Sequence, residues 1–266
     1  MLFRSIPAWK LAALSGFSPS AFLRPMRTLV ISDIHSNADA LEAVLADAGG
    51  FDRAWCLGDV IGYGPDPNEC IQMLEDLPDL VCILGNHDAA AMGFIDTESF
   101  NREASAAVHI QERLLTEASR EFLESLEVLR VEAGVTLAHG SPRNPIWEYI
   151  LSAKTAKENF LAFETQVCLI GHSHIPVIFA DDQLKQPEVL LPASGDMWRS
   201  EKQFILNPGS VGQPRDRSPL ASYVIWDDLE DIWSFHRVVY DYRPVQERIL
   251  ALGLPPRHAY RLAEGI

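Results

Sequence analysis

Five short apolar runs in this sequence end in the same way, and this repetition constrains the fold more than any other feature. Each run of four or five residues stops at side chains that can bind a metal ion, often directly after a glycine. Open α/β sheets bind ligands beyond the carboxyl ends of their strands, so we expect these side chains to converge at one sheet edge. In chain order they are Asp33 and His35, Asp59, Asn86 with His87 and Asp88, His139, and His172 and His174.

The number of these ends, rather than any one of them, indicates a metal site. A single histidine at a strand end is usually a surface residue, and Gly-Asp or Gly-Asn there is usually a turn. Here five of the eight histidines follow the apolar runs, and we expect structural roles for His109, His236 and His258. Imidazoles and carboxylates without thiolates suit Mn, Fe, Zn, Ni or Co. Two such ions about 3.5–4 Å apart can activate water and hold a phosphoryl group.

Strand and helix patterns alternate in the first part of the chain, and strands dominate later. Predicted strands cover residues 28–31, 54–57, 80–84, 128–132, 135–138, 167–170, 177–180, 203–206, 222–226 and 232–239. Helices are predicted after caps at Asn37 and Asp66, and over about 100–115, 117–126, 153–163, 244–252 and 255–263. The last third is predicted to be antiparallel. The pattern predicts an α/β (α+β-like) fold with two mixed sheets packed as a sandwich between helices.

Charge and cysteine usage limit the partners and the compartment. The formal net charge of −15 disfavours stable nucleic-acid binding, and an anionic substrate would need a cation in its site. No apolar run is long enough for a transmembrane helix, so no membrane partner is expected. The four cysteines show no C-x-x-C spacing and are expected to be reduced thiols, which favours a cytoplasmic protein.

Residues 1–25 differ from the rest of the chain because they contain basic residues and no acidic ones. This composition is compatible with an organelle targeting segment, and with an ordered addition. A misplaced start is a third interpretation, since M-R-T-L-V-I-S-D at Met26 runs directly into the first predicted strand. We therefore separate an N-terminal extension, 1–25, from one domain predicted over 26–266.

The ordered motifs resemble those of the calcineurin-like metallophosphoesterase superfamily over about residues 27–240. They are D-x-H, G-D, G-N-H-D, a lone H and G-H-x-H. The segments G-D-V-I-G-Y-G-P-D-P-N-E-C, H-G-S-P-R-N-P-I-W-E-Y and N-P-G-S-V-G-Q-P-R-D are similar to its compact bacterial phosphodiesterase branch. The resemblance implies a four-layer sandwich, in agreement with the pattern above.

The resemblance also implies a centre of two divalent ions, for which manganese is favoured. Asp59 would bridge the ions, and the other ligands would be Asp33, His35 and His174 for the first and Asn86, His139 and His172 for the second. A hydroxide bridging the ions would attack phosphorus without a covalent enzyme intermediate. His87 would protonate the leaving-group oxygen or stabilise the transition state, and Asp88 would support the ligands from behind.

Substrate contacts and function are less closely determined. Tyr63, Arg143 and Arg215 are candidate substrate contacts; an ordinary turn for Tyr63 and surface ion pairs for the arginines are the alternatives. The expected activity is hydrolysis of small phosphodiesters or nucleotides, such as cyclic nucleotides or dinucleoside polyphosphates. A protein Ser/Thr phosphatase and a non-catalytic scaffold of the same fold remain alternatives, although His87 and all seven implied ligands are intact. The physiological substrate, the native metal and a possible homo-oligomer stay open.

Overall fold

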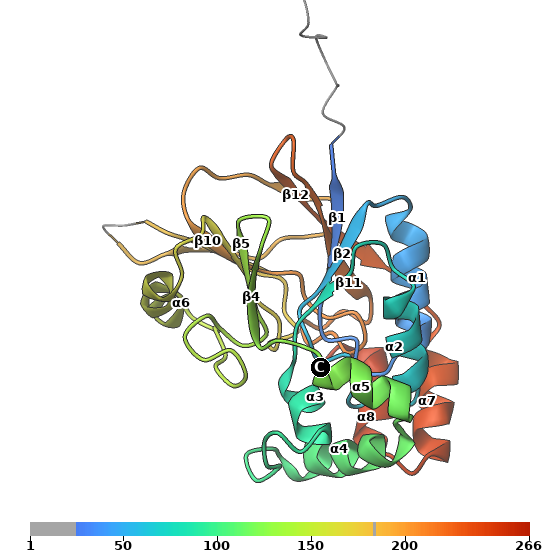
Figure 1. Cartoon of the computed structure of the whole chain (residues 1–266). Helices are drawn as coiled ribbons and strands as arrows, with labels where there is room; N and C mark the ends of the chain where they lie inside the picture. Colours follow the sequence, from blue (N-terminus) through green and yellow to red (C-terminus); the bar gives the residue numbers. More distant parts are fainter. Residues whose placement is uncertain (1–24, 183–184) are drawn as a thin grey trace, which may run out of the picture.

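The computed structural model describes residues 25–182 and 185–266, and its strands form two six-stranded sheets. Figure 1 shows the sheets packed against each other, with most helices beside the sheet that contains β1 and with α6 beside the other sheet. The predicted sandwich of two mixed sheets with flanking helices is therefore confirmed. The N-terminal extension predicted at 1–25 lies outside the described residues, apart from Pro25.

Each sheet contains three neighbouring strands that run parallel. The first has the order β3-β2-β1-β11-β12-β9, in which β1, β2 and β3 are parallel. Its strands are β1 (Arg27–Ile31), β2 (Arg53–Cys56), β3 (Val81–Cys82), β9 (Met197–Trp198), β11 (Ala221–Asp227) and β12 (Ile232–Val238). The second has the order β4-β5-β6-β10-β7-β8, in which β5, β6 and β10 are parallel. Its strands are β4 (Leu129–Glu132), β5 (Val135–Ala138), β6 (Val167–Leu169), β7 (Val177–Ala180), β8 (Glu188–Leu190) and β10 (Phe204–Asn207).

Alternate residues of the strands enter different hydrophobic layers. On β1, Val30 packs between the sheets with Trp55, whereas Leu29 and Ile31 face the helices. All of these side chains are buried because both faces of the sheet are covered, which is why the sequence of β1 is continuously apolar. A third layer lies between the second sheet and α6 (Ala153–Asn159), where Ala156 packs with residues of β6, β7 and β10.

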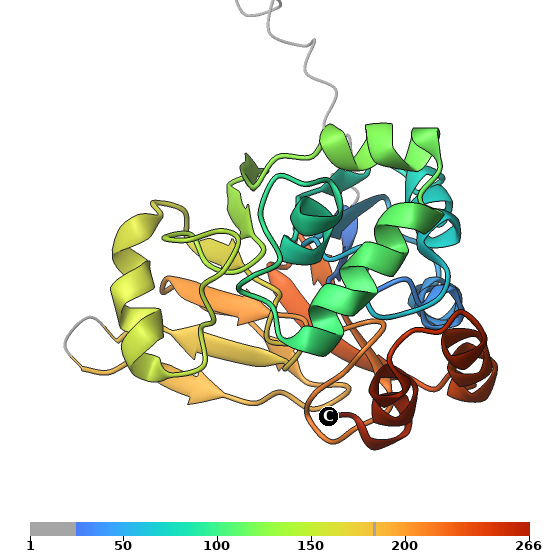
Figure 2. The same ribbon diagram turned by 90° about the horizontal axis from the view of Figure 1, so that it is seen from below.

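Helices from the N-terminal half of the chain and from its C-terminal end cover the same face of the first sheet. They are α1 (Ala38–Ala48), α2 (Pro67–Glu75), α4 (Arg102–Leu114), α5 (Glu117–Glu124), α7 (Tyr242–Ala251) and α8 (Pro256–Glu264). Figure 2 shows α7 and α8 next to the N-terminal helices. Asp66 is the N-cap residue of α2, as expected, but its side chain makes no capping hydrogen bond to the helix. Its carboxylate instead accepts a hydrogen bond from Arg248 of α7 over 2.8 Å. No helix of the described residues is long and apolar enough to cross a membrane.

Three sequence-based element predictions were wrong in detail. The strand predicted at 80–84 is only β3, and the chain then forms an unpredicted short helix, α3 (Asn86–Ala91), because Asp88 caps it by accepting from the Gly85 N–H over 3.0 Å. The edge strands β8 and β9 were not predicted. The last third is antiparallel at β11 and β12, but β10 also pairs in parallel with β6.

Candidate metal centre

The carboxyl ends of six parallel strands, three from each sheet, meet at one edge of the sandwich. Backbone hydrogen bonds join the loops that follow them. The Asp33 N–H donates to the Gly58 carbonyl oxygen over 3.0 Å, and the Gly212 N–H donates to the Asp33 carbonyl oxygen over 3.0 Å. The five predicted ends therefore lie together, and the segment after β10 is a sixth.

Two groups of buried side chains at this edge could each hold a metal ion. The nitrogen and oxygen atoms within each group lie within 4.8 Å of one another, and Asp59 belongs to both groups. The groups are Asp33, His35, Asp59 and His174, and Asp59, His139 and His172. Asn86 adjoins the second group, because its Oδ1 lies 3.1 Å from His139 Nε2.

Backbone carbonyl oxygens orient three of the histidine rings. Each accepts from a ring Nδ1, which must carry the proton because a carbonyl oxygen cannot donate. In the neutral form of each ring the opposite nitrogen, Nε2, then directs a lone pair into the cluster, as is usual for metal-binding histidines. The pairs are His35 with Ile61 at 3.1 Å, His139 with Leu57 at 2.8 Å and His174 with Gln213 at 2.6 Å.

The facing lone pairs fit a bound cation. The Nε2 atoms of His35 and His174 are 3.1 Å apart although each Nδ1 carries its ring's proton, and Asp33 Oδ1 lies 3.3 Å from His174 Nε2. Two nitrogen ligands about 2.1 Å from one ion, at right angles to each other, would lie about 3 Å apart. In the second group His139 Nε2 similarly faces His172 Nδ1 at 3.1 Å and Asp59 Oδ2 at 3.3 Å.

Burial and neighbouring charges set the protonation of these groups. Burial lowers the pKa values of His35, His172 and His174 well below the usual range, so their rings are neutral and can bind a metal. Burial would raise the pKa of Asp59, but His139, His87 and His35 together hold that pKa below its usual range. Burial would lower the pKa of His139, but Asp59 raises it to about 9, so a cation that binds Nε2 of this ring must displace a proton. The carboxylate of Asp59 thus stays negative in the interior only beside a positive charge.

His87 lies beside the cluster and is held at two points. Its backbone N–H donates to Asp59 Oδ1 over 2.9 Å, and its Nε2 lies 2.9 Å from the Tyr63 hydroxyl. Arg215 Nη2 donates to the same hydroxyl over 3.4 Å, so the Tyr63 proton is free to go to His87 Nε2. Burial lowers the pKa of His87 to about 4. Tyr63 therefore fixes the orientation of the His87 ring.

Two side chains that belong to neither metal group hold the loops in place. The Asp88 carboxylate accepts from the N–H groups of Val60 and Ile61, over 3.2 and 3.0 Å, as well as from Gly85, and so ties α3 to the loop that carries Asp59. Asn207, at the end of β10, donates to the Gly171 carbonyl oxygen over 2.6 Å. These contacts agree with the supporting role expected for Asp88, and Asn207 likewise holds the loop that follows β6.

The three candidate substrate contacts lie in different surroundings. Tyr63 and Arg215 adjoin His87, as described above. Arg143 instead pairs with the carboxylates of Glu148 and Glu158, the latter over 2.7 Å. Its guanidinium is therefore paired with one carboxylate of the loop that follows β5 and with one carboxylate of α6.

The three remaining histidines are outside both metal groups. His109 is exposed on α4 beside Glu112, and the ring of His236 stacks on Tyr223 with centroids 4.8 Å apart. His258 of α8 packs against Tyr63 at 4.6 Å. These positions agree with the structural roles expected for them.

Some residues around the cluster were not identified from the sequence. The Gln213 carbonyl that orients His174 has no side-chain signature, although its place after an apolar run could have indicated it. Trp147 and Tyr149 lie in a segment whose resemblance was noted, but they were given no role. The Tyr149 ring stacks on His172, with centroids 3.7 Å apart and planes 24° apart.

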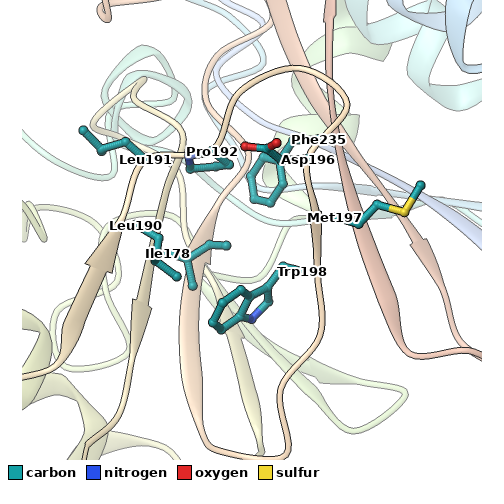
Figure 3. Close-up of a pocket in the computed structure, with 8 residues that line it drawn as sticks. All are labelled: Ile178, Leu190, Leu191, Pro192, Asp196, Met197, Trp198 and Phe235. Atoms are coloured by element: carbon teal, nitrogen blue, oxygen red, sulfur yellow. The ribbon is translucent and has the colours of Figure 1, made fainter.

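A separate apolar pocket lies where the outer edges of the two sheets approach each other. Its volume is about 240 Å³. Figure 3 shows Ile178, Leu190 and Trp198 pointing into it, with Phe235 on the side of the first sheet. Its lining includes none of the side chains of the two metal groups. Among the described residues, both groups that could hold a metal ion lie at the strand-end edge.

Comparisons with known proteins agree over most of the chain. A family model described as the calcineurin-like phosphoesterase superfamily domain matches residues 26–230. An uncharacterised protein of Methanocaldococcus jannaschii is 35% identical over 244 residues, which cover 89% of this chain and 97% of that protein. The crystal structure of a metallophosphoesterase from Sphaerobacter thermophilus is 41% identical and covers 91% of this chain and 100% of its own, with a TM-score of 0.85.

Similarity to enzymes whose substrate is known is shorter. A symmetrical bis(5'-nucleosyl)-tetraphosphatase of Pseudomonas fluorescens is 29% identical over 146 residues. The matched segment spans 50% of this chain and 47% of that protein. The chain thus matches about half the length of this relative.

Proposed function

The chain belongs to the calcineurin-like phosphoesterase superfamily and is a phosphoric ester hydrolase, and we propose that it cleaves small phosphodiesters or nucleotides with two divalent metal ions. The observation that carries this proposal is the position of Asp59. Its buried carboxylate is shared by two groups of potential ligands, one completed by side chains after β1 and β6 and the other by side chains after β5 and β6. A shared carboxylate is the usual bridge of a two-metal site.

In this proposal seven residues bind the ions and His87 acts on the leaving group. Asp33, His35 and His174 would hold one ion, Asn86, His139 and His172 the other, and Asp59 both. When bound, the ions would lower the pKa of water to supply the nucleophile and would neutralise phosphoryl charge. An anionic substrate beside His87 would raise the pKa of its ring above the value of about 4 found in this structure, and the protonated ring would then donate to the leaving-group oxygen. Tyr63 keeps the His87 ring in place for that transfer, since its hydroxyl bonds to Nε2.

The acidity of the chain is compatible with an anionic substrate under this proposal. A net charge of −15 would repel phosphate esters, but two divalent ions make the site locally cationic. The names of the tetraphosphatase relatives support dinucleoside polyphosphates as the substrates to test first, with cyclic nucleotides tested beside them. Manganese is the favoured ion, and the four free cysteines fit the cytoplasm.

The test combines metal analysis with a substrate screen. The purified protein, loaded with manganese and desalted, should contain about two ions per chain. It should then hydrolyse at least one member of a panel of cyclic nucleotides, dinucleoside polyphosphates and simple diesters. The His87→Ala variant, purified separately by the same procedure, controls for contaminating phosphatases. Absence of bound metal after loading would refute the proposal.

A further inference from the structure

We propose that Trp147 and Tyr149 form a stacking subsite for a nucleobase beside the metal centre. This inference rests on the proposed function and adds to it the part of the substrate that the metal ligands cannot recognise. In this proposal Arg143, Glu148 and Asn159 fix the conformation of the loop that carries the two rings.

The ring of Tyr149 lies directly on a proposed metal ligand. It stacks on His172 with centroids 3.7 Å apart and planes 24° apart, and 44% of the residue is exposed. Because His172 covers one face of the ring, the opposite face is the one open to a flat ligand. A base stacked there would extend the row of rings that begins at the second metal group.

A second row of rings leads from His87 to Trp147. The Phe100 ring meets the edge of His87 at a centroid distance of 5.0 Å, and it meets Trp147 at 5.0 Å with planes 69° apart. Phe100 and Trp147 are both half-buried. Aromatic side chains thus adjoin both the proposed proton donor and a proposed ligand, and the site between them is the one that would hold phosphate.

The loop that carries Trp147 and Tyr149 is held by the residue between them. Glu148 Oε2 accepts from Ser141 Oγ over 2.7 Å and from Asn159 Nδ2 over 2.9 Å, and Glu148 also pairs with Arg143. Ile150, which follows Tyr149, is buried in the layer between α6 and the second sheet. A preformed loop loses little conformational entropy when a ligand binds. Arg143 is therefore a positioning residue of this loop.

A nucleobase suits these rings better than an aliphatic group does. Every base has a flat π-face, and stacking on an aromatic side chain strengthens binding about 5- to 150-fold per base. If the phosphate of a nucleotide is bound at the metal centre, its base gains binding free energy by stacking on a flat aromatic surface within reach. Trp147 and Tyr149 provide that surface at the rim of the site.

The experiment compares adenosine 5'-monophosphate with ribose 5-phosphate, which differ only by the base. Binding to the manganese-loaded protein is measured by calorimetry, with phosphate release followed in parallel. We expect the wild-type protein to bind the nucleotide about 5- to 150-fold more tightly. Trp147→Ala and Tyr149→Ala should each reduce this ratio without changing the affinity for ribose 5-phosphate, whereas Tyr149→Phe should keep it.

Two further variants sharpen the result. Tyr260→Ala removes an exposed aromatic ring from α8 and should leave the ratio unchanged. Arg143→Ala should weaken binding of the nucleotide alone, whereas loss of a phosphate contact would weaken both compounds equally and overturn the role given to Arg143.

The outcomes separate this inference from the proposed function. Equal affinity of the wild-type protein for the two compounds, or an unchanged ratio in both alanine variants, would overturn the stacking subsite while leaving the metal centre in place. If the metal-loaded protein binds neither compound, the subsite is overturned, whereas metal content and the substrate panel decide the proposed function separately.

Discussion

Five of the seven proposed ligands have a left-handed backbone, which residues other than glycine adopt infrequently. The φ angles are +54° for Asp33, +50° for His35, +52° for Asp59, +65° for His172 and +59° for His174. Each such residue costs about 1–3 kcal/mol and persists only where the surrounding structure enforces it. These residues lie where the chain turns sharply after a strand and where their side chains must still point into the cluster.

At the residue scale, Asp59→Asn tests the bridge. The amide can still accept the hydrogen bond from the His87 N–H, but it lacks the negative charge needed to hold two cations. We expect at least one of the two ions to be lost, as measured by elemental analysis after manganese loading. Two ions bound as in the wild-type protein would contradict the bridging role.

His87→Ala separates metal binding from proton transfer. His87 belongs to neither metal group, so the variant should retain both ions while its turnover falls about 10²- to 10⁴-fold. His109→Ala is the matched control, because that histidine is exposed on α4. Unchanged turnover of His87→Ala in steady-state kinetics would remove it from the mechanism.

At the scale of elements, the ends of neighbouring strands pack too closely to admit side chains. A Cβ added to Gly85 would overlap the backbone nitrogen and Oδ1 of Asp59. A Cβ on Gly171 would overlap Ser32 Oγ in the same way. The Gly-Asn and Gly-His pairs of the motifs are thus explained by contact between loops of adjacent strands.

Gly85→Ala should therefore disturb the metal centre from behind. We expect it to lower the free energy of unfolding by about 1–3 kcal/mol, because overpacking displaces Asp59, and to weaken metal binding. Gly50→Ala is the matched control, since a Cβ there meets no atom within 4 Å, and it should change stability by less than about 0.5 kcal/mol. Denaturant unfolding with equal effects for the two variants would contradict the close-packing argument.

The loop after β5 should respond to acid through Glu148. The hydrogen bond from Arg143 lowers the pKa of Glu148 to about 2. A lowered pKa means that the contribution of Glu148 to stability is complete above its usual pKa of about 4.5 and is lost as the pH falls toward 2. Carboxyl NMR should place its titration near pH 2, and Arg143→Ala should move the midpoint upward; no movement would exclude the pairing.

At the scale of the whole molecule, the residues of the proposed metal centre come from both sheets. Asp33, His35 and Asp59 follow strands of the first sheet, whereas His139, His172 and His174 follow strands of the second. Backbone bonds also cross here, such as that from the Val211 N–H to the Ser32 carbonyl oxygen over 3.0 Å. Bound ions would therefore act as cross-links between the halves of the sandwich.

Metal loading should consequently raise the thermal stability of the protein. A ligand that binds only the folded state at 100 times its Kd adds about 2.7 kcal/mol to the free energy of unfolding. We expect the Tm to rise with manganese concentration, to fall again with a chelator, and to respond less in Asp59→Asn. A Tm that does not depend on metal would contradict a cross-linking centre.

The sequence by itself determined the strand-end residues, the two-sheet class and the helical layers, because these depend on local patterns of period two and 3.6 and on motifs within a few residues. The tertiary structure alone decided that β10 is a parallel neighbour of β6, that Gln213 orients His174, that α3 begins at Asn86 and that Arg143 pairs with Glu148. The first two depend on which distant segments pack together, whereas the capping bond of α3 and the ion pair of Arg143 are local contacts of side chains that leave no periodic trace in the sequence. The motifs predicted which residues meet; the packing of the sheets decided how they are held.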